Sequence, residues 1–98
     1  MTSNKVTLTI NGNRLEIAIF VQQFIKQVVI GMLSALKGVG EIHSVHLVCR
    51  DDQVEISING TAVPSNEFVN EFVGNTVRGM VSSLKGVEQI EHLEISIT

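Results

Sequence analysis

The chain has 98 residues, of which 44% are hydrophobic but only 4% aromatic, so its core must consist mainly of aliphatic side chains. This length suits one domain with an ordinary core, and we expect a single domain over residues 1–98. A net charge of −3 argues against binding to nucleic-acid phosphates, and the presence of one cysteine excludes an internal disulfide.

Nothing at the N-terminus indicates export. Residues 1–5 contain no basic segment followed by an apolar run, which a secretion signal requires. The single cysteine, Cys49, fits a reducing compartment. We therefore expect a cytoplasmic protein.

The first predicted strand covers residues 5–10, where apolar and polar residues alternate. A period of two is typical of a strand with one buried and one open face. The following Asn11-Gly12 favours a type I′ hairpin turn, and Asn59-Gly60 repeats it. Residues 13–16 and 61–63 therefore either form short extra strands or connect directly to the helices.

The first predicted helix carries a broad apolar stripe with helical spacing. The stripe comprises Phe20, Val21, Phe24, Ile25, Val28, Val29, Met32, Leu33 and Leu36. Ile17 to Leu36 is mostly apolar and long enough for a membrane span, but Lys26 near its centre would cost about 2.5–3.5 kcal/mol on insertion. The segment is therefore predicted to be an amphipathic helix whose stripe, including both phenylalanines, faces the core.

The second half of the chain repeats the first at an offset of 48 residues. Residues 6–50 align with 54–98 without a gap, and 16 of the 45 pairs are identical. We infer an internal duplication. The second helix carries the equivalent stripe within 68–84, and the second strand of each half is predicted over 45–49 and 93–97.

The predicted order is β-α-β-β-α-β, which is typical of an α+β ferredoxin-like two-layer sandwich. Such a sandwich has a four-stranded antiparallel sheet, in the order fourth, first, third, second, with two helices on one face. The polar connection from Arg50 to Gln53 is predicted to be the hairpin between the halves. Gly31 and Gly79 weaken their helices and are predicted to lie where the two helices pack closely.

The sequence Leu-Lys-Gly-Val, at 36–39 and 84–87, ends each helix before a strand and resembles the turn of heavy-metal-associated domains and ACT regulatory domains. The resemblance covers the architecture and this turn. Heavy-metal-associated domains carry Cys-x-x-Cys after the first strand, where this chain has Asn11-Gly12-Asn13-Arg14 and Asn59-Gly60-Thr61-Ala62. Their metal-binding function is therefore not expected, and no cofactor is predicted.

The open face of the predicted sheet is polar and offers one candidate site. Its titratable residues are His46, Glu55, His92 and Glu94. The assumed strand order places His46 and His92 on opposite edges, about 14 Å apart, which is too far to share a metal ion within one subunit. The face has no aromatic residue for base stacking, so no nucleic-acid binding is expected. No catalytic or metal motif stands out in the sequence.

The two predicted helices differ on the side away from the apolar stripe. Helix 1 presents Ile19, Gln23, Lys26 and Ile30 there, and helix 2 presents Glu67, Glu71, Gly74 and Arg78. Exposed apolar residues often mark contacts, although isolated ones are common on protein surfaces. The first set is therefore a candidate interface with a partner protein or a second subunit.

These observations favour a non-catalytic protein-interaction or assembly module that forms a homo-oligomer. The alternative is a small-molecule sensor or a small enzyme that uses the polar open face at a subunit interface. Neither function requires contact with a membrane.

Overall fold

Each half of the chain folds into a hairpin, a helix and a further strand. The computed structural model describes residues 5–35, 40–51, 53–64, 66–84 and 89–98. The first half contains β1 (Val6–Ile10), β2 (Asn13–Leu15), α1 (Ile19–Ser34) and β3 (Val45–Arg50). The second half contains β4 (Gln53–Ile58), β5 (Thr61–Val63), α2 (Glu67–Ser82) and β6 (His92–Ile97). Short strands therefore do follow both Asn-Gly turns.

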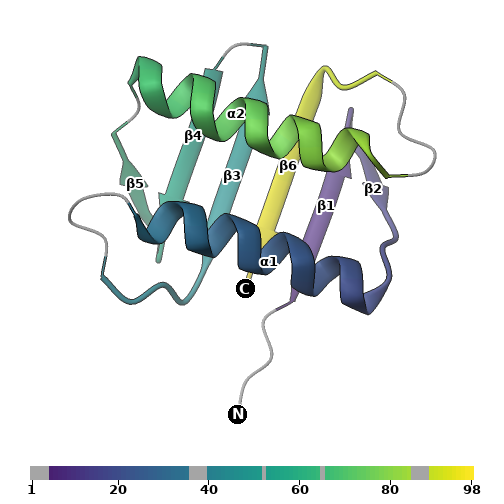
Figure 1. The fold of residues 1–98 in the computed structure, drawn as a ribbon, viewed down its shortest axis with the longest axis horizontal. Helices are drawn as coiled ribbons and strands as arrows, with labels where there is room; N and C mark the ends of the chain where they lie inside the picture. The colour runs from purple at the N-terminus through teal and green to yellow at the C-terminus, as the bar shows by residue number, and fades with distance from the viewer. Residues whose placement is uncertain (1–4, 36–39, 52, 65, 85–88) are drawn as a thin grey trace.

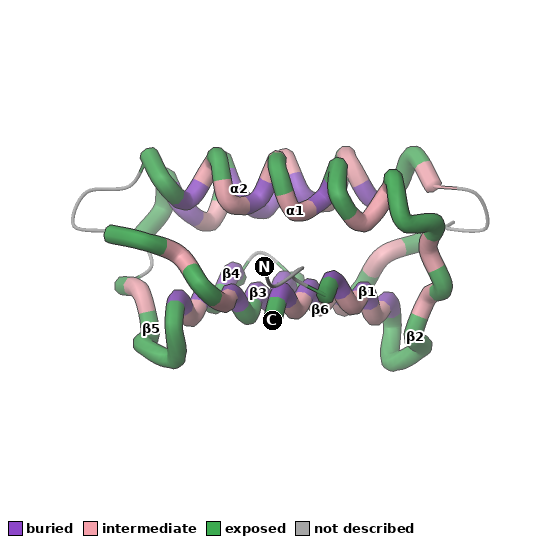
Figure 2. Tube along the Cα trace, turned by 90° about the horizontal axis from the view of Figure 1, so that it is seen from below, coloured by how far each residue is buried: buried purple, intermediate pink, exposed green. Residues whose placement is uncertain are grey.

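The protein has two layers, with both helices on the same face of the sheet (Figure 1). α1 and α2 lie side by side, point in opposite directions and run across the strands rather than along them (Figure 1). Seen from the side, both helices of the described residues lie on one face of the sheet, and none of them covers the other face (Figure 2). The α+β prediction is therefore confirmed.

The sheet differs from the predicted one in size and order. The described residues form six antiparallel strands in the order β2-β1-β6-β3-β4-β5, because the short strands β2 and β5 extend the four expected ones at both edges. The predicted strand order is wrong, because β6 pairs with both β1 and β3, while β1 and β4 are not neighbours. The ferredoxin-like arrangement is therefore not confirmed.

The two hairpins explain the observed strand order. After β2 the chain stands at one edge of the sheet, so α1 starts there and crosses to the other side (Figure 1). A helix of 16 residues is about 24 Å long, which matches the width of six strands spaced about 4.8 Å apart. The chain then returns to β3 and leaves one strand position beside β1, which β6 fills. From β5, α2 makes the equivalent crossing in the opposite direction.

The two ends of the described chain meet in the middle of the sheet. Lys5 N donates to Thr98 O at 2.7 Å, and Thr98 N donates to Lys5 O at 2.9 Å. β6 is thus paired along both of its sides, although it is the last strand in chain order.

Both Asn-Gly turns have the conformation that the sequence predicts. Asn11 and Gly12 have φ values of 52° and 83°, and Asn59 and Gly60 have 54° and 83°. A type I′ turn requires positive φ at both central residues, which asparagine and glycine tolerate better than other residues.

The side chains of these asparagines also join the two halves. Asn11 Nδ2 donates to Gln89 O at 2.7 Å, and Asn11 Oδ1 accepts from Glu91 N and His92 N. Asn59 does the same in the other half, with the backbone of Glu41, His43 and Ser44. The turn after β1 therefore holds the segment that leads into β6, and the turn after β4 holds the segment that leads into β3.

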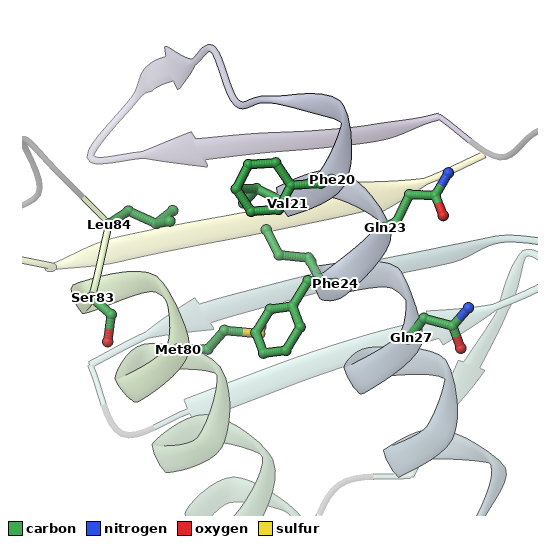
Figure 3. Close-up of a pocket in the computed structure, with 9 residues that line it drawn as sticks. Phe20, Val21, Gln23, Phe24, Gln27, Met80, Ser83 and Leu84 are labelled. Carbon is green, nitrogen blue, oxygen red and sulfur yellow. The ribbon is translucent and has the colours of Figure 1, made fainter.

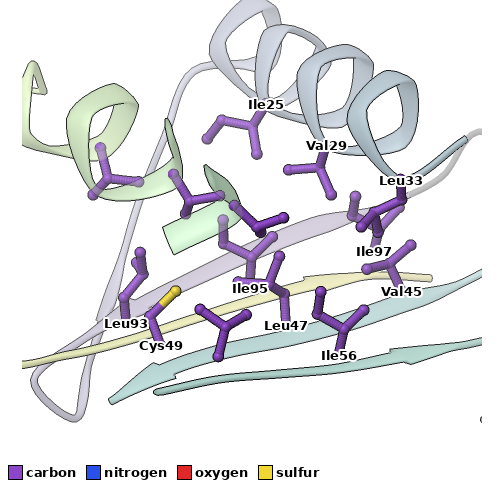
Figure 4. Packing of buried hydrophobic residues seen from close by; sticks show 14 of the residues in the cluster. Ile25, Val29, Leu33, Val45, Leu47, Cys49, Ile56, Leu93, Ile95 and Ile97 are labelled. Atoms are coloured by element: carbon purple, nitrogen blue, oxygen red, sulfur yellow. The ribbon is translucent and has the colours of Figure 1, made fainter. Parts of the chain in front are cut away.

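Aliphatic side chains fill the space between the layers (Figure 4). The inward side chains of α1 are Ile25, Val29 and Leu33, and those of α2 are Val69, Val73, Val77 and Val81. Cys49 on β3 belongs to the same core. Burial raises the pKa of its thiol, and the positive charge of Arg78 partly opposes this shift. Cys49 is therefore a small apolar core residue.

The helix ends are described only in part. The Leu-Lys-Gly-Val turns lie outside the described residues, except for Leu84. At the start of α2, the side chain of Asn66 accepts a hydrogen bond from Val69 N at 2.8 Å. α1 begins after Ala18 without a side-chain cap. Only α2 thus has the start that asparagine typically gives a helix.

Candidate interaction surface on the helix layer

The four phenylalanines lie on the side of the helices that faces away from the sheet, which we call the outer helix surface. Phe20 is 76% exposed, Phe24 59%, Phe68 64% and Phe72 51%. The prediction that they face the core is wrong, because the apolar stripe is wider than the contact that the sheet offers. Only side chains on the inner face of each helix reach the sheet, so one edge of the stripe stays outside.

A groove of about 550 Å³ lies between the N-terminal half of α1 and the C-terminal end of α2. Phe20 and Phe24 line it on one side, and Met80 and Leu84 line it on the other (Figure 3). The ring of Phe24 points toward Met80 across the groove (Figure 3). The groove is therefore an apolar depression that opens onto the outer helix surface.

The phenylalanines of α2 form a stacked pair at the opposite end of the helix layer. The ring centroids of Phe68 and Phe72 lie 5.4 Å apart, and their planes differ by 8°. Glu67 and Glu71 lie beside them along a second, more polar depression. Both ends of the helix layer thus present two aromatic side chains to the outside.

The outer helix surface is alike in the two halves of the chain. Identical and exposed in both halves are Phe20 and Phe68, Phe24 and Phe72, Gly31 and Gly79, and Ser34 and Ser82. Core packing does not account for this agreement, because these side chains point away from the sheet. The sequence already contains the signal, a Phe-x-x-x-Phe motif at the same place in each half, but its helical spacing within the apolar stripe predicts a core position.

Gly31 and Gly79 lie on the outer helix surface and not between the helices. Both are exposed, and apart from its chain neighbours and the backbone of its own helix, a Cβ atom at either position would meet no atom of the described residues within 4 Å. The prediction that they let α1 and α2 pack closely is therefore wrong. Each glycine follows the second phenylalanine of its helix by seven residues, which is about two turns, so it points in nearly the same direction.

The predicted interface residues of helix 1 lie partly on this surface. Ile19 is 74% exposed, and Gln23 is exposed at the groove. Lys26 is half-buried, and Ile30 packs partly buried against the core. Ile19 and Gln23 therefore border the phenylalanines, and the set of four remains a predicted interface.

On the open face of the sheet, two of the four polar residues predicted there, His46 and Glu94, contact each other. His46 Nε2 lies 2.5 Å from Glu94 Oε2, on the neighbouring central strands β3 and β6. Glu55 lies on β4, and Val48 stands between it and Glu94 in the strand register. The two carboxylates are therefore separated by two strand spacings, or about 10 Å.

The prediction that His46 and His92 lie on opposite edges is wrong, because their strands are neighbours in the sheet. They are nevertheless apart along the strands, since His46 pairs with Ser96, four residues or about 13 Å from His92. His92 Nε2 is buried and has no hydrogen-bond partner among the described residues. Over the same residues, no three His, Cys, Asp or Glu side chains are grouped in a way that could hold a metal ion.

Comparisons with known proteins do not place the chain in a family. No protein-family model, no curated protein and no solved structure matches it. In the part of the chain that is described, neither helix has the length and apolar content needed to cross a bilayer.

Proposed function

We propose that this protein is a non-catalytic interaction module that binds a protein partner through the outer helix surface. The observation that supports this is the set of four phenylalanines, each more than half exposed to solvent. Apolar patches on a protein surface often mark contacts, and aromatic side chains are enriched in the centres of interfaces. A partner that covers them would remove apolar area from water, which is favourable.

Two further parts of the proposal are an internal duplication and a location in the cytoplasm. The matching order of elements in the two halves supports an internal duplication. The single, buried Cys49 supports a reducing compartment such as the cytoplasm. A homo-oligomer is one form that the interaction can take.

Photo-crosslinking tests the proposal. The photoreactive analogue p-benzoylphenylalanine replaces Phe24 or Phe72 in cells that produce the protein, and we expect irradiation to link these positions to a protein chain. The matched control carries the analogue at Glu55, which is exposed on the open sheet face. Links from Glu55 combined with none from either phenylalanine would contradict the proposal.

One observation favours a second candidate function on the open sheet face. The contact between His46 and Glu94 brings a base and a carboxylate together on two rigid central strands. We propose, as the alternative, a small-molecule sensor or small enzyme that uses this pair at a subunit interface. Native mass spectrometry of the freshly purified protein should then show a bound small molecule that Glu94→Gln removes. A protein free of added mass counts against this alternative.

A further inference from the structure

We infer that the partner on the outer helix surface is a second copy of this chain, packed face to face. The inference rests on the proposed function and names its partner. In the dimer, the half of each helix that carries phenylalanine covers the half that carries glycine in the helix facing it. Every such contact is made twice, as in a symmetric dimer with one two-fold axis.

Each helix has a bulky half and an open half on its outer side. In α1, Phe20 and Phe24 project from the N-terminal half, and Gly31 follows in the C-terminal half. The equivalent residues of α2 repeat this arrangement. Because a Cβ placed at Gly31 would meet no atom of the described residues within 4 Å beyond its chain neighbours and the backbone of its own helix, the space above it is free for a side chain from outside.

The antiparallel arrangement of the helices makes this pattern self-complementary. α1 and α2 point in opposite directions within one layer (Figure 1). A two-fold axis that lies parallel to that layer and between the two outer helix surfaces, either along the helices or across them, sets each helix antiparallel to the one it faces. The bulky half then lies over the open half at every contact, as a knob lies over a hole. A second copy has this pattern by its own sequence, whereas an unrelated chain would have to reproduce it.

The exposed apolar area is in the range that a dimer needs. A fully exposed aromatic side chain offers about 150–250 Å², so four phenylalanines that are 51% to 76% exposed supply roughly 500 Å². A standard interface takes about 800 Å² from each partner. The phenylalanines therefore provide more than half of the share of one protomer, and Ile19 beside Phe20 adds to it.

The middle of the outer helix surface is polar but uncharged. Gln27 and Asn75 occupy the midpoints of α1 and α2, and both are exposed. An amide both donates and accepts, so these side chains can hydrogen-bond across the two-fold axis. Glu67 and Glu71 lie at the start of α2, near the rim, where interfaces tolerate charge.

Sedimentation equilibrium tests the inference. At about 100 μM we expect twice the single-chain mass of 10.7 kDa. In the combined variant Phe24→Glu and Phe72→Glu, association should weaken on the order of 100-fold or more, because carboxylates would replace the aromatic side chains that pack on the partner. Both side chains are more than half exposed in the single chain, so the fold should persist, which far-UV circular dichroism checks. The matched control, Asn13→Glu with Thr61→Glu on the exposed edge strands, should remain dimeric.

Filling the open halves provides an independent measurement. The combined variant Gly31→Leu and Gly79→Leu adds apolar side chains to the surface, so a merely adhesive surface would associate more strongly. If the phenylalanines of the partner instead pack over these glycines, the leucine side chains would occupy that space and association should weaken. The added side chains have free space within the single chain, and leucine favours helices over glycine, so the fold should gain stability.

The outcomes separate this inference from the proposed function. A wild-type chain that is monomeric at about 100 μM overturns the inference. If Phe24 then still crosslinks to another protein, the proposed function stands with a different partner, and if it links to nothing, both fail. A dimer whose mass does not change in the phenylalanine variant also overturns the inference, because its copies meet elsewhere.

Disulfide trapping distinguishes the two axes. If the axis runs across the helices, α1 faces its own copy, and Gln27→Cys alone should form a linked dimer under mild oxidation. If the axis runs along the helices, only a mixture of Gln27→Cys and Asn75→Cys should form it. Either result supports the inference, and Cys49 does not interfere because it is 2% exposed. Links that form only with the control Glu55→Cys would overturn it.

Discussion

The outer helix surface and the open sheet face are each built from both matching halves of the chain but differ in chemistry. On β6, buried Leu93, Ile95 and Ile97 alternate with half-buried His92, Glu94 and Ser96, so this strand separates apolar from polar residues. On the helices, apolar residues continue past the core contact and place phenylalanines outside. A strand offers two directions only, whereas a helix offers its whole circumference, so an apolar stripe on a helix can exceed the surface that covers it.

The largest expected effect is a difference in the free energy of unfolding between variants on the two sides of β6. Ile95→Ala removes a side chain that is 0% exposed, so the free energy of unfolding should fall by about 2–5 kcal/mol. Ser96→Ala, on the open side of the same strand, should change it by less than about 0.5 kcal/mol. Urea denaturation measures both. Similar losses for the two variants would mean that the open face is also packed against something.

The next effect concerns the asparagines at the turns. Asn11→Gly keeps the positive φ but loses three hydrogen bonds to the segment before β6, so we expect a loss of about 1–3 kcal/mol. Asn11→Asp retains the oxygen acceptors and should lose less. Equal stability of the glycine variant and the wild type in urea would show that the turn conformation alone matters.

On the helix side, alanine at the exposed glycines should stabilise the fold. Gly31→Ala and Gly79→Ala should each raise the free energy of unfolding by about 1 kcal/mol, because each Cβ meets open space and alanine favours helices. Gly74→Ala is the matched contrast, since its Cβ would lie 2.8 Å from Arg78 Nη2 and 3.2 Å from Val54 Cγ2. No gain is expected there. Thermal unfolding in dilute solution, where association is minimal, measures all three variants.

The His46–Glu94 pair should contribute little to stability. The two side chains are 50% and 38% exposed, and water screens such pairs. His46→Ala should therefore reduce the free energy of unfolding by less than about 1 kcal/mol. A loss well above this in urea denaturation would indicate that the pair organises the open face.

The smallest effect appears only at alkaline pH. Burial raises the pKa of the Cys49 thiol above its ordinary value of 9.0, so the unfolded chain loses this proton first as the pH rises. Above pH 9 the unfolded state thus binds fewer protons than the folded state, and the free energy of unfolding should decline with pH. Well below pH 9 both states keep the thiol proton, so the buried thiol then causes no loss of stability. Cys49→Ala should remove this part of the decline, which urea titrations from pH 8 to 10 would show.

The strands and turns could be predicted from the sequence because their signals are local. The alternation in residues 5–10 and the pairs Asn11-Gly12 and Asn59-Gly60 each determine structure over a few residues. The order of strands could not be predicted in this way. β1, β3, β4 and β6 all carry apolar residues at every second position, so the pattern fits several neighbours equally well.

The candidate surface was harder to predict than the fold. The stripe on α1 contains both Ile25, which is 1% exposed, and Phe24 beside it, which is 59% exposed. Residue type does not separate them, because both are apolar and adjacent. Whether a side chain of the stripe is buried depends on which side of α1 faces the sheet. That orientation depends on how α1 crosses the strands after the β1–β2 hairpin.

The central place of β6 has a consequence for folding. Its pairing with β1 joins Val6 to Ile97, about 90 residues apart in the chain, and contacts so distant in sequence slow folding toward milliseconds or seconds. Until β6 has been synthesised, β1 and β3 each keep an unpaired edge, and such edges can pair with other chains. The interval between synthesis of β3 and of β6 is therefore the period in which this protein is most prone to aggregate.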